Sequence, residues 1–124
     1  MKLQKISSLA MTIQEIIKRT GGVIQCGEHR KGDKIGRAFC SDLMSDVLTL
    51  GCQDILLITG LANVQTIRTA EMADISYILF VRDKSISDEM LQLAAENDMV
   101  LVRCHSSMFK VAGELYTAGL QPVY

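Results

Sequence analysis

The sequence Asp54-Ile55-Leu56-Leu57-Ile58-Thr59 is an almost continuous apolar run with the length of one β-strand. A strand that is apolar on both faces is typical of the centre of a parallel sheet, where helices cover both sides. A second run of this kind spans residues 75–81. Because amphipathic segments alternate with these runs, we predict an α/β domain of three α/β/α layers, with a mostly parallel sheet of about five strands.

Residues of the type that begin helices precede the amphipathic segments. Thr12 and Glu15 have the spacing of a capping box, and Gly21-Gly22 predicts where that helix ends. Further helices are expected to begin at Ser41 or Asp42, Asn63, Ser87 or Asp88, and Ser106. The final helix is expected to bury Met108, Ala112, Leu115 and Tyr116. The other strands are expected at residues 23–26, 35–40 and 99–103.

The length of 124 residues corresponds to about one domain. We expect a single domain over residues 11–124, and residues 1–10 either extend the first helix or form a separate N-terminal arm. Apolar residues make up 48% and charged residues 22% of the chain, which is the composition of an ordinary globular domain.

The charge and hydropathy of the chain exclude several classes of partner. Lys and Arg number 13 and Asp and Glu number 14, so the sequence lacks the positive charge of a nucleic-acid-binding protein. It contains no apolar run of the ~20 residues that span a bilayer, and it begins without the apolar centre of a secretion signal. We therefore expect a cytoplasmic protein with reduced cysteines and neither nucleic acid nor membrane as a partner.

Short catalytic signatures are absent from the sequence. Residues 22–27 have the G-x-x-x-x-G frame of a phosphate-binding loop, but Glu28 and His29 stand where Lys and Ser or Thr must bind phosphate and magnesium. We therefore predict no catalytic residues, no metal and no cofactor.

Four residues offer an alternative, which is a metal or thiol enzyme. Cys26 and His29, together with Cys104 and His105, include the soft and imidazole ligands that a metal site requires. The simpler interpretation, which we favour, is that the cysteines are small buried side chains on strands.

Polar residues gather where the predicted strands end. The carboxyl ends of parallel strands meet at one edge of a sheet, where free backbone N–H groups and helix dipoles favour an anion. The residues expected to bind a ligand at this edge are Ser41, Asp42, Thr59, Gly60, Asn63, His105, Ser106 and Ser107. The carboxylates of Asp42 and Asp46 would repel a phosphate, so Thr59, Gly60 and Asn63 are the better anion contacts.

The stretch Ser41-Asp42-Leu43-Met44-Ser45-Asp46-Val47 resembles the S-D-L-x-S-D-V segment of the DRTGG-domain family. Weaker similarity extends from residue 11 to about residue 120. The resemblance implies an α/β/α module related to the N-terminal domain of HPr kinase/phosphorylase, with a regulatory or assembly role and common dimerisation. The kinase chemistry of that relative lies in a separate phosphate-loop domain, so the resemblance implies no catalytic residues here.

These observations lead to one main hypothesis and two alternatives. The main one is a non-catalytic regulatory and dimerisation module that binds a nucleotide or a phosphorylated metabolite at the strand-end edge. The alternatives are a structural subunit that docks another protein, and the Cys/His metal or thiol enzyme. A homodimer is the expected assembly, because a chain of this size leaves apolar surface to cover.

Overall fold

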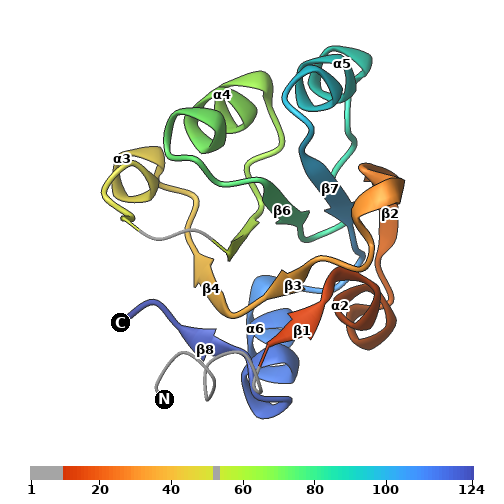
Figure 1. Ribbon diagram of the computed structural model, residues 1–124, viewed down its shortest axis with the longest axis vertical. Helices are drawn as coiled ribbons and strands as arrows, with labels where there is room; N and C mark the ends of the chain where they lie inside the picture. The colour runs from red at the N-terminus through yellow and green to blue at the C-terminus, as the bar shows by residue number, and fades with distance from the viewer. Residues whose placement is uncertain (1–9, 52–53) are drawn as a thin grey trace.

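The computed structural model describes residues 10–51 and 54–124, and within these ranges one six-stranded sheet forms the middle layer. Its strands are β2 (Val23–Cys26), β4 (Arg37–Cys40), β5 (Ile55–Thr59), β6 (Tyr77–Phe80), β7 (Val100–Arg103) and β8 (Gln121–Pro122). Their order across the sheet is β2-β7-β6-β5-β4-β8 (Figure 1). All neighbours are parallel except β2, which runs antiparallel to β7, so the predicted mostly parallel sheet is confirmed.

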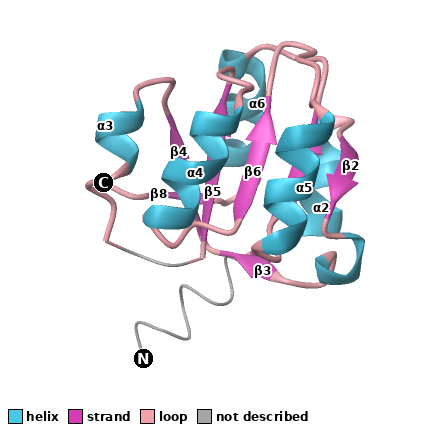
Figure 2. Ribbon diagram, turned by 90° about the horizontal axis from the view of Figure 1, so that it is seen from above, coloured by secondary structure: helices cyan, strands magenta, loops and turns pink. Residues whose placement is uncertain are grey.

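Helices cover both faces of the sheet. They are α2 (Ile13–Thr20), α3 (Met44–Val47), α4 (Val64–Met72), α5 (Asp88–Glu96) and α6 (Met108–Thr117), with a 3-10 turn, η1, at Glu28–Arg30. In Figure 2, α3, α4 and α5 lie on the near face of the sheet, and α2 and α6 lie behind it. This arrangement confirms the predicted three-layer α/β/α fold.

Strand β5 connects the two layers of the core. All five of its residues are buried. Leu56 and Ile58 belong to the apolar cluster that includes α2 and α6, whereas Ile55 and Leu57 belong to the cluster of α3, α4 and α5. Because successive side chains of a strand point to opposite faces, a strand between two helical layers must be apolar throughout.

The predicted start and end of the first helix are confirmed. The backbone N–H of Glu15 donates to Thr12 Oγ1 at 3.1 Å, and the N–H of Thr12 donates back to Glu15 Oε1 at 3.0 Å. Gly21 ends the helix with φ of 67°, a conformation that glycine adopts without strain. Asn63 and Ser87 cap α4 and α5 as predicted.

The strand predicted at residues 35–40 is divided into two. Ile35 belongs to a short strand, β3 (Lys34–Ile35), which pairs antiparallel with β1 (Met11–Thr12) in a separate two-stranded ribbon. Arg37 begins β4 opposite Ile55 in the main sheet. Gly36 is the point at which the chain passes from one sheet to the other.

Two predicted helix caps are wrong. Neither Ser41 nor Asp42 caps α3, whose N-cap is Leu43, because Ser41 Oγ accepts the N–H of Leu43 and Asp42 is bound elsewhere. The cap of α6 is Ser107, not Ser106, because Ser107 Oγ accepts the N–H of Lys110.

The buried face of α6 agrees with the prediction in part. Leu115 is buried and Met108 and Ala112 are half-buried, but Tyr116 is 68% exposed and Val111, which was not predicted, is buried. Each residue turns a helix by about 100°, so Tyr116 lies at the margin of the stripe that Leu115 and Ala112 define, on the side toward solvent.

Two further expectations concern the N-terminal arm and membrane-spanning segments. The proposed N-terminal arm falls on residues 1–10, of which residues 1–9 lie outside the described residues. Of residues 10–51 and 54–124, none belongs to a helix that is long and apolar enough to cross a membrane.

Candidate functional site

The carboxyl ends of the parallel strands lie at one edge of the sheet, at the top of Figure 2, and four residues converge there. Oδ1 of Asp42 accepts a hydrogen bond of 2.8 Å from Thr59 Oγ1 and another of 2.8 Å from the backbone N–H of Gly60. Arg82 Nη2 lies 3.4 Å from the other oxygen of Asp42. Three donors from two loops therefore surround one carboxylate.

The turn after β5 places two of these donors. Thr59 is the last residue of β5 and is fully buried, and its Oγ1 also accepts the N–H of Leu61 at 3.1 Å. A Cβ at Gly60 would collide with the guanidinium of Arg82, so a residue without a side chain is needed for Arg82 to lie there. Thr59 thus supplies the buried hydroxyl, and Gly60 leaves the space that the guanidinium of Arg82 occupies.

The loop after β6 has an unusual backbone. Arg82 and Asp83 have φ of 64° and 55°, and a left-handed conformation is unfavourable by about 1–2 kcal/mol for a residue with a side chain. Hydrogen bonds from their N–H groups to the carbonyls of Ser106 and Cys104, at 2.8 and 2.9 Å, hold them in place. Strained residues of this kind are concentrated at functional sites.

A further ion pair connects the loops after β6 and β7. Arg103 donates from Nε to the carbonyl of Lys84 at 2.7 Å and from Nη2 to Asp83 Oδ1 at 2.9 Å. His105 is almost fully exposed, and its Nδ1 lies 3.8 Å from Asp83 Oδ2. Arg103 and His105 thus accompany Asp83, whereas the charges that act on Asp42 are those of Arg82 and Lys84.

The surroundings of Asp42 favour its charged form. The N–H of Gly60 lowers the pKa of Asp42 most strongly; partial burial opposes this, and Thr59 and Arg82 lower the pKa further. The net pKa lies below the ordinary value of an aspartate. Asp42 is thus a carboxylate at neutral pH and acts as an internal anion.

The structure brings together some of the predicted ligand-binding residues and separates others. Asp42, Thr59 and Gly60 are in direct contact, and Ser106 and His105 contact the neighbouring loop of Arg82 and Asp83. The remaining three serve local structure. Ser41 forms a turn with Leu43, Asn63 Oδ1 accepts the N–H of Thr66, and Ser107 Oγ accepts the N–H of Lys110.

Arg82 is the residue that sequence reasoning missed. It directly follows the apolar run of residues 75–81, which is predicted as a buried strand, and it is not among the residues expected to bind a ligand. The signal that could have identified it is its position, because Arg82 follows β6 much as Gly60 follows β5. Both residues lie at the strand ends where an open α/β sheet binds ligands.

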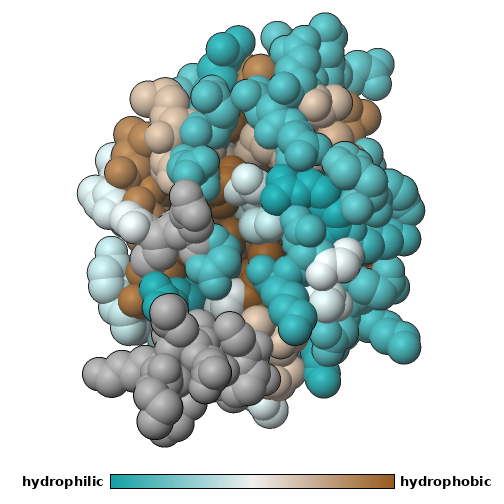
Figure 3. All heavy atoms as spheres, viewed as in Figure 1, coloured by the Kyte–Doolittle hydropathy of each residue, from teal (hydrophilic) through white to brown (hydrophobic). Residues whose placement is uncertain are grey.

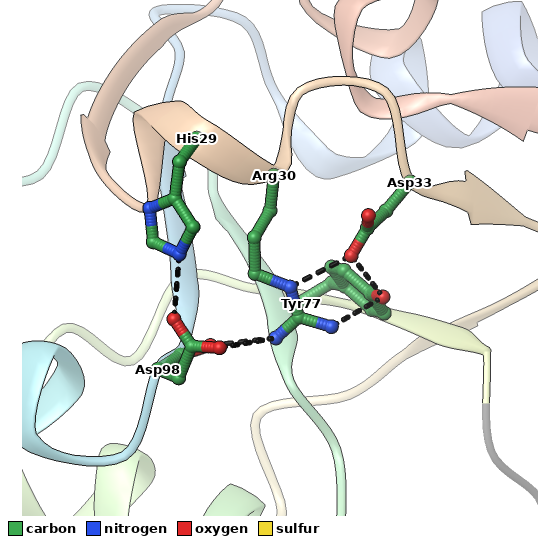
Figure 4. Close-up of polar contacts among 5 residues, drawn as sticks. All are labelled: His29, Arg30, Asp33, Tyr77 and Asp98. Atoms are coloured by element: carbon green, nitrogen blue, oxygen red, sulfur yellow. Dashed lines mark hydrogen bonds and ion pairs between the residues drawn. The ribbon is translucent and has the colours of Figure 1, made fainter.

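A second polar cluster lies at the opposite edge of the sheet (Figure 4). Arg30 Nε and the hydroxyl of Tyr77 both donate to Asp33 Oδ2, at 2.7 and 2.9 Å, and Arg30 Nη1 donates to the carbonyl of Asp98 at 2.6 Å. His29 Nε2 lies 2.7 Å from Asp98 Oδ1. These contacts tie η1 to the starts of β6 and β7, so this cluster has a clear structural role.

Figure 3 shows this same edge toward the viewer. Hydrophilic residues cover the right of the view, over η1, β2 and α5, and apolar residues gather at the left, around α3. The loop of residues 27–34, which contains η1, is therefore part of a polar surface, and Arg30 links it to Tyr77 at the start of β6.

The cysteines offer little support for thiol chemistry. Cys104 is buried in the core cluster of α2 and α6. Burial raises the pKa of the Cys104 thiol above its ordinary value, which keeps it protonated at neutral pH. Cys26 is half-buried and Cys40 is exposed, so the expected burial holds fully only for Cys104, but partial desolvation of the thiol raises the pKa of both. Within the described residues, no three His, Cys, Asp or Glu side chains are placed to hold a metal ion.

Comparison with known proteins gives a structural likeness only. No protein-family model matches the sequence, and no curated protein matches it. The fold is similar to a crystal structure of the CBS and DRTGG domains of the regulatory region of Clostridium perfringens pyrophosphatase, complexed with its activator, diadenosine tetraphosphate. The TM-score is 0.75 at 14% sequence identity, over 96% of this chain and 51% of that one. This chain, which spans about half the length of that structure, therefore has a DRTGG-like fold, as the sequence resemblance predicts.

Proposed function

We propose that this chain is a non-catalytic, cytoplasmic regulatory module that binds the phosphate groups of a nucleotide or another phosphorylated metabolite at the carboxyl edge of its sheet. The observation that carries the proposal is the set of donors from Thr59, Gly60 and Arg82, which surrounds the carboxylate of Asp42. A hydroxyl, a backbone N–H and a guanidinium are the groups that bind phosphate in proteins.

The proposed binding step is an exchange of anions. A phosphate oxygen takes the place of Asp42 Oδ1 on Thr59 and Gly60, while Arg82 contacts a second phosphate oxygen. Asp42 then moves away, and because it lies two residues before α3, the loop between β4 and α3 moves with it. Ligand binding at this edge would thus change the surface around α3, as a regulatory module requires.

The structural neighbour supports the class of ligand. It is a regulatory region complexed with a dinucleotide activator, diadenosine tetraphosphate. This compound is therefore the first probe, and ATP and inorganic tripolyphosphate are the next, because they separate the contribution of the base from that of the phosphates.

The test is isothermal titration calorimetry with these three probes on the wild-type chain and on two variants. Arg82→Gln should weaken binding at least about tenfold, because a hydrogen bond to a charged group contributes about 1.5–3 kcal/mol. Asp42→Asn should tighten binding, because it removes the competing negative charge. Asp54→Asn is the matched control: it makes the same change in an exposed residue directly before β5, at the opposite edge of the sheet, and should leave affinity unchanged.

The outcomes separate the parts of the proposal. Absence of binding for all three probes at millimolar concentration would contradict ligand binding. Weaker binding by Asp42→Asn would show that Asp42 holds the ligand and is not displaced by it. A thermal melt of each variant establishes that the fold is intact.

The proposal includes self-association, because apolar side chains remain on the surface after both sheet faces are covered. A protein partner is the second candidate function. The observation that favours it is the apolar surface around α3, where Leu43 and Leu48 are 58% and 48% exposed (Figure 3). Leu43→Ser together with Leu48→Ser should abolish binding to such a partner and leave nucleotide affinity unchanged.

A further inference from the structure

We propose that the outer face of α6 is the interface through which two copies of this chain associate, antiparallel about a two-fold axis between Ala112 and Gly113. The inference rests on the self-association part of the proposed function and names the surface that carries it. It concerns a surface other than that of α3, because α6 packs on the opposite face of the sheet.

Two aromatic side chains stand out on this face. Phe109 is 89% exposed and Tyr116 is 68% exposed. Gly113 lies between them on the same side of the helix, since residues four and seven positions apart share a helix face. Val111 and Leu115 bury the other side of α6 in the core. Exposed apolar residues that lie together on one face, unlike singly scattered ones, are typical of an interaction surface.

The arrangement of these residues is self-complementary. In an antiparallel pair with its axis between Ala112 and Gly113, Phe109 lies opposite Tyr116 of the partner subunit, and the same contact recurs on the other side of the axis. A Cβ at Gly113 would have nothing within 4 Å in the single chain, so the centre of the face is open. A glycine at the crossing point allows two helices to approach closely.

The charges on α6 favour the antiparallel orientation. By the 100° spacing of a helix, Lys110 and Glu114 lie to one side of the aromatic rings; Lys110 is exposed and Glu114 is half-buried. An antiparallel pair places Lys110 beside Glu114 of the partner subunit, so opposite charges meet twice. A parallel pair would place Lys110 beside Lys110 of the partner subunit and Glu114 beside Glu114 of the partner subunit. This is unfavourable because like charges would meet.

A cavity beside the aromatic side of the face provides a place for one ring. Its volume is about 210 Å³, and it lies between α6 and the sheet edge formed by β4 and β8. The residues that line it are mostly apolar, and they are Ala38, Cys40, Ile58, Ala112, Leu115, Tyr116, Leu120, Gln121 and Pro122. An apolar cavity of about 150 Å³ holds a benzene ring. Phe109 of the partner subunit, arriving next to Tyr116, is therefore the occupant that we assign to it.

The first test is sedimentation velocity on the full chain from about 1 to 200 µM, with phosphate-free buffer. The wild type should be a dimer over most of this range. Phe109→Asp should raise the dimer dissociation constant at least about 30-fold, as expected for a central interface residue. Met72→Asp is the matched control, because Met72 is 69% exposed on α4, on the other face of the sheet, and should not affect association.

Charge reversal tests the orientation. Lys110→Glu and Glu114→Lys should each weaken the dimer, and the double variant should restore it, because the antiparallel pairing is recovered with the charges exchanged. Failure of the double variant to restore the dimer would overturn the antiparallel geometry. Circular dichroism melts of the exposed-site variants should superimpose on that of the wild type.

The remaining outcomes are distinguishable. A dimer that survives Phe109→Asp would overturn this surface and leave self-association standing. A wild-type chain that is monomeric at 200 µM would overturn both this surface and self-association. Calorimetry with diadenosine tetraphosphate on Phe109→Asp reports separately on the ligand site.

Discussion

At the scale of single residues, Tyr77 is held between a cation and a carboxylate. Its hydroxyl accepts a hydrogen bond from Arg30 Nη2 at 2.9 Å and donates one to Asp33 Oδ2 at 2.9 Å. Partial burial raises the pKa of Tyr77 to about 12, the bond to Asp33 adds to this, and the charge of Arg30 opposes it. The fold therefore prefers the protonated hydroxyl.

This preference predicts a dependence of stability on high pH. Below pH 10 the hydroxyl is protonated in both the folded and the unfolded chain, so its contribution is fully present. Between pH 10 and about 12 the unfolded chain releases the proton and the folded chain keeps it, so the free energy of unfolding falls as pH rises. Urea unfolding of the wild type and of Tyr77→Phe at pH 9 and pH 11.5 should show a smaller decrease for the variant. An equal decrease in both would contradict the prediction.

Residue-scale reasoning from the sequence found part of the candidate site. Thr59 and Gly60 could be predicted because they follow a recognisable buried strand and carry hydrogen-bond donors. The role of Asp42 could not, because its partners are 17 and 18 residues away and nothing local indicates that its carboxylate turns toward them. The position of Asp42 in the sequence suggested a helix cap or a group that repels phosphate. In the structure, its carboxylate itself accepts the hydrogen bonds of Thr59 and Gly60, the donors that were expected to bind an anion.

At the scale of elements, α2 depends on its reciprocal cap. Thr12→Ala removes the acceptor for the N–H of Glu15 and the partner of its carboxylate, so it should lower the free energy of unfolding by about 1 kcal/mol. Thr12→Ser keeps the oxygen and should have a much smaller effect. Urea denaturation at pH 7 measures both, and equal stability of the alanine and wild-type chains would contradict the role of the cap.

The longer elements were predictable and the short ones were not. Helices α4 and α5 have a polar cap and an apolar stripe, which are local signals. Helix α3 covers only Met44–Val47 and lacks a side-chain cap, and the nearby carboxylate of Asp42 is bound to Thr59 and Gly60 instead. Strand β8 contains two residues, one of them Pro122, and it exists because β4 provides an edge for it.

At the scale of the whole molecule, the two helical layers share one sheet. Leu56 and Leu57 are fully buried neighbours in β5 that face opposite layers. Leu56→Ala and Leu57→Ala should each lower the free energy of unfolding by about 2–5 kcal/mol. Since β5 belongs to both layers, fluorescence of the tyrosines and far-UV circular dichroism should report a single coincident transition in each variant. Separate transitions would show that the layers unfold independently.

The general architecture followed from the sequence because its signals are compositional. A strand that is apolar on both faces, such as residues 55–59, must be shielded from water by helices on each side of the sheet. Such a strand therefore predicts a central sheet between two layers of helices. The antiparallel direction of β2 could not be predicted, because it depends on which edge of the finished sheet is free when β2 docks beside β7.

The placement of the two edge strands has a consequence for synthesis on the ribosome. Val23 pairs with Arg103, and Arg37 pairs with Gln121, so each edge of the sheet joins an early part of the chain to one of its last parts. The central strands can pair with their sequence neighbours as they emerge, whereas β2 has no partner strand until β7 has left the exit tunnel. A nascent chain that stalls before β7 would thus present an unpaired strand and the apolar side of α2, which is the kind of surface that chaperones bind.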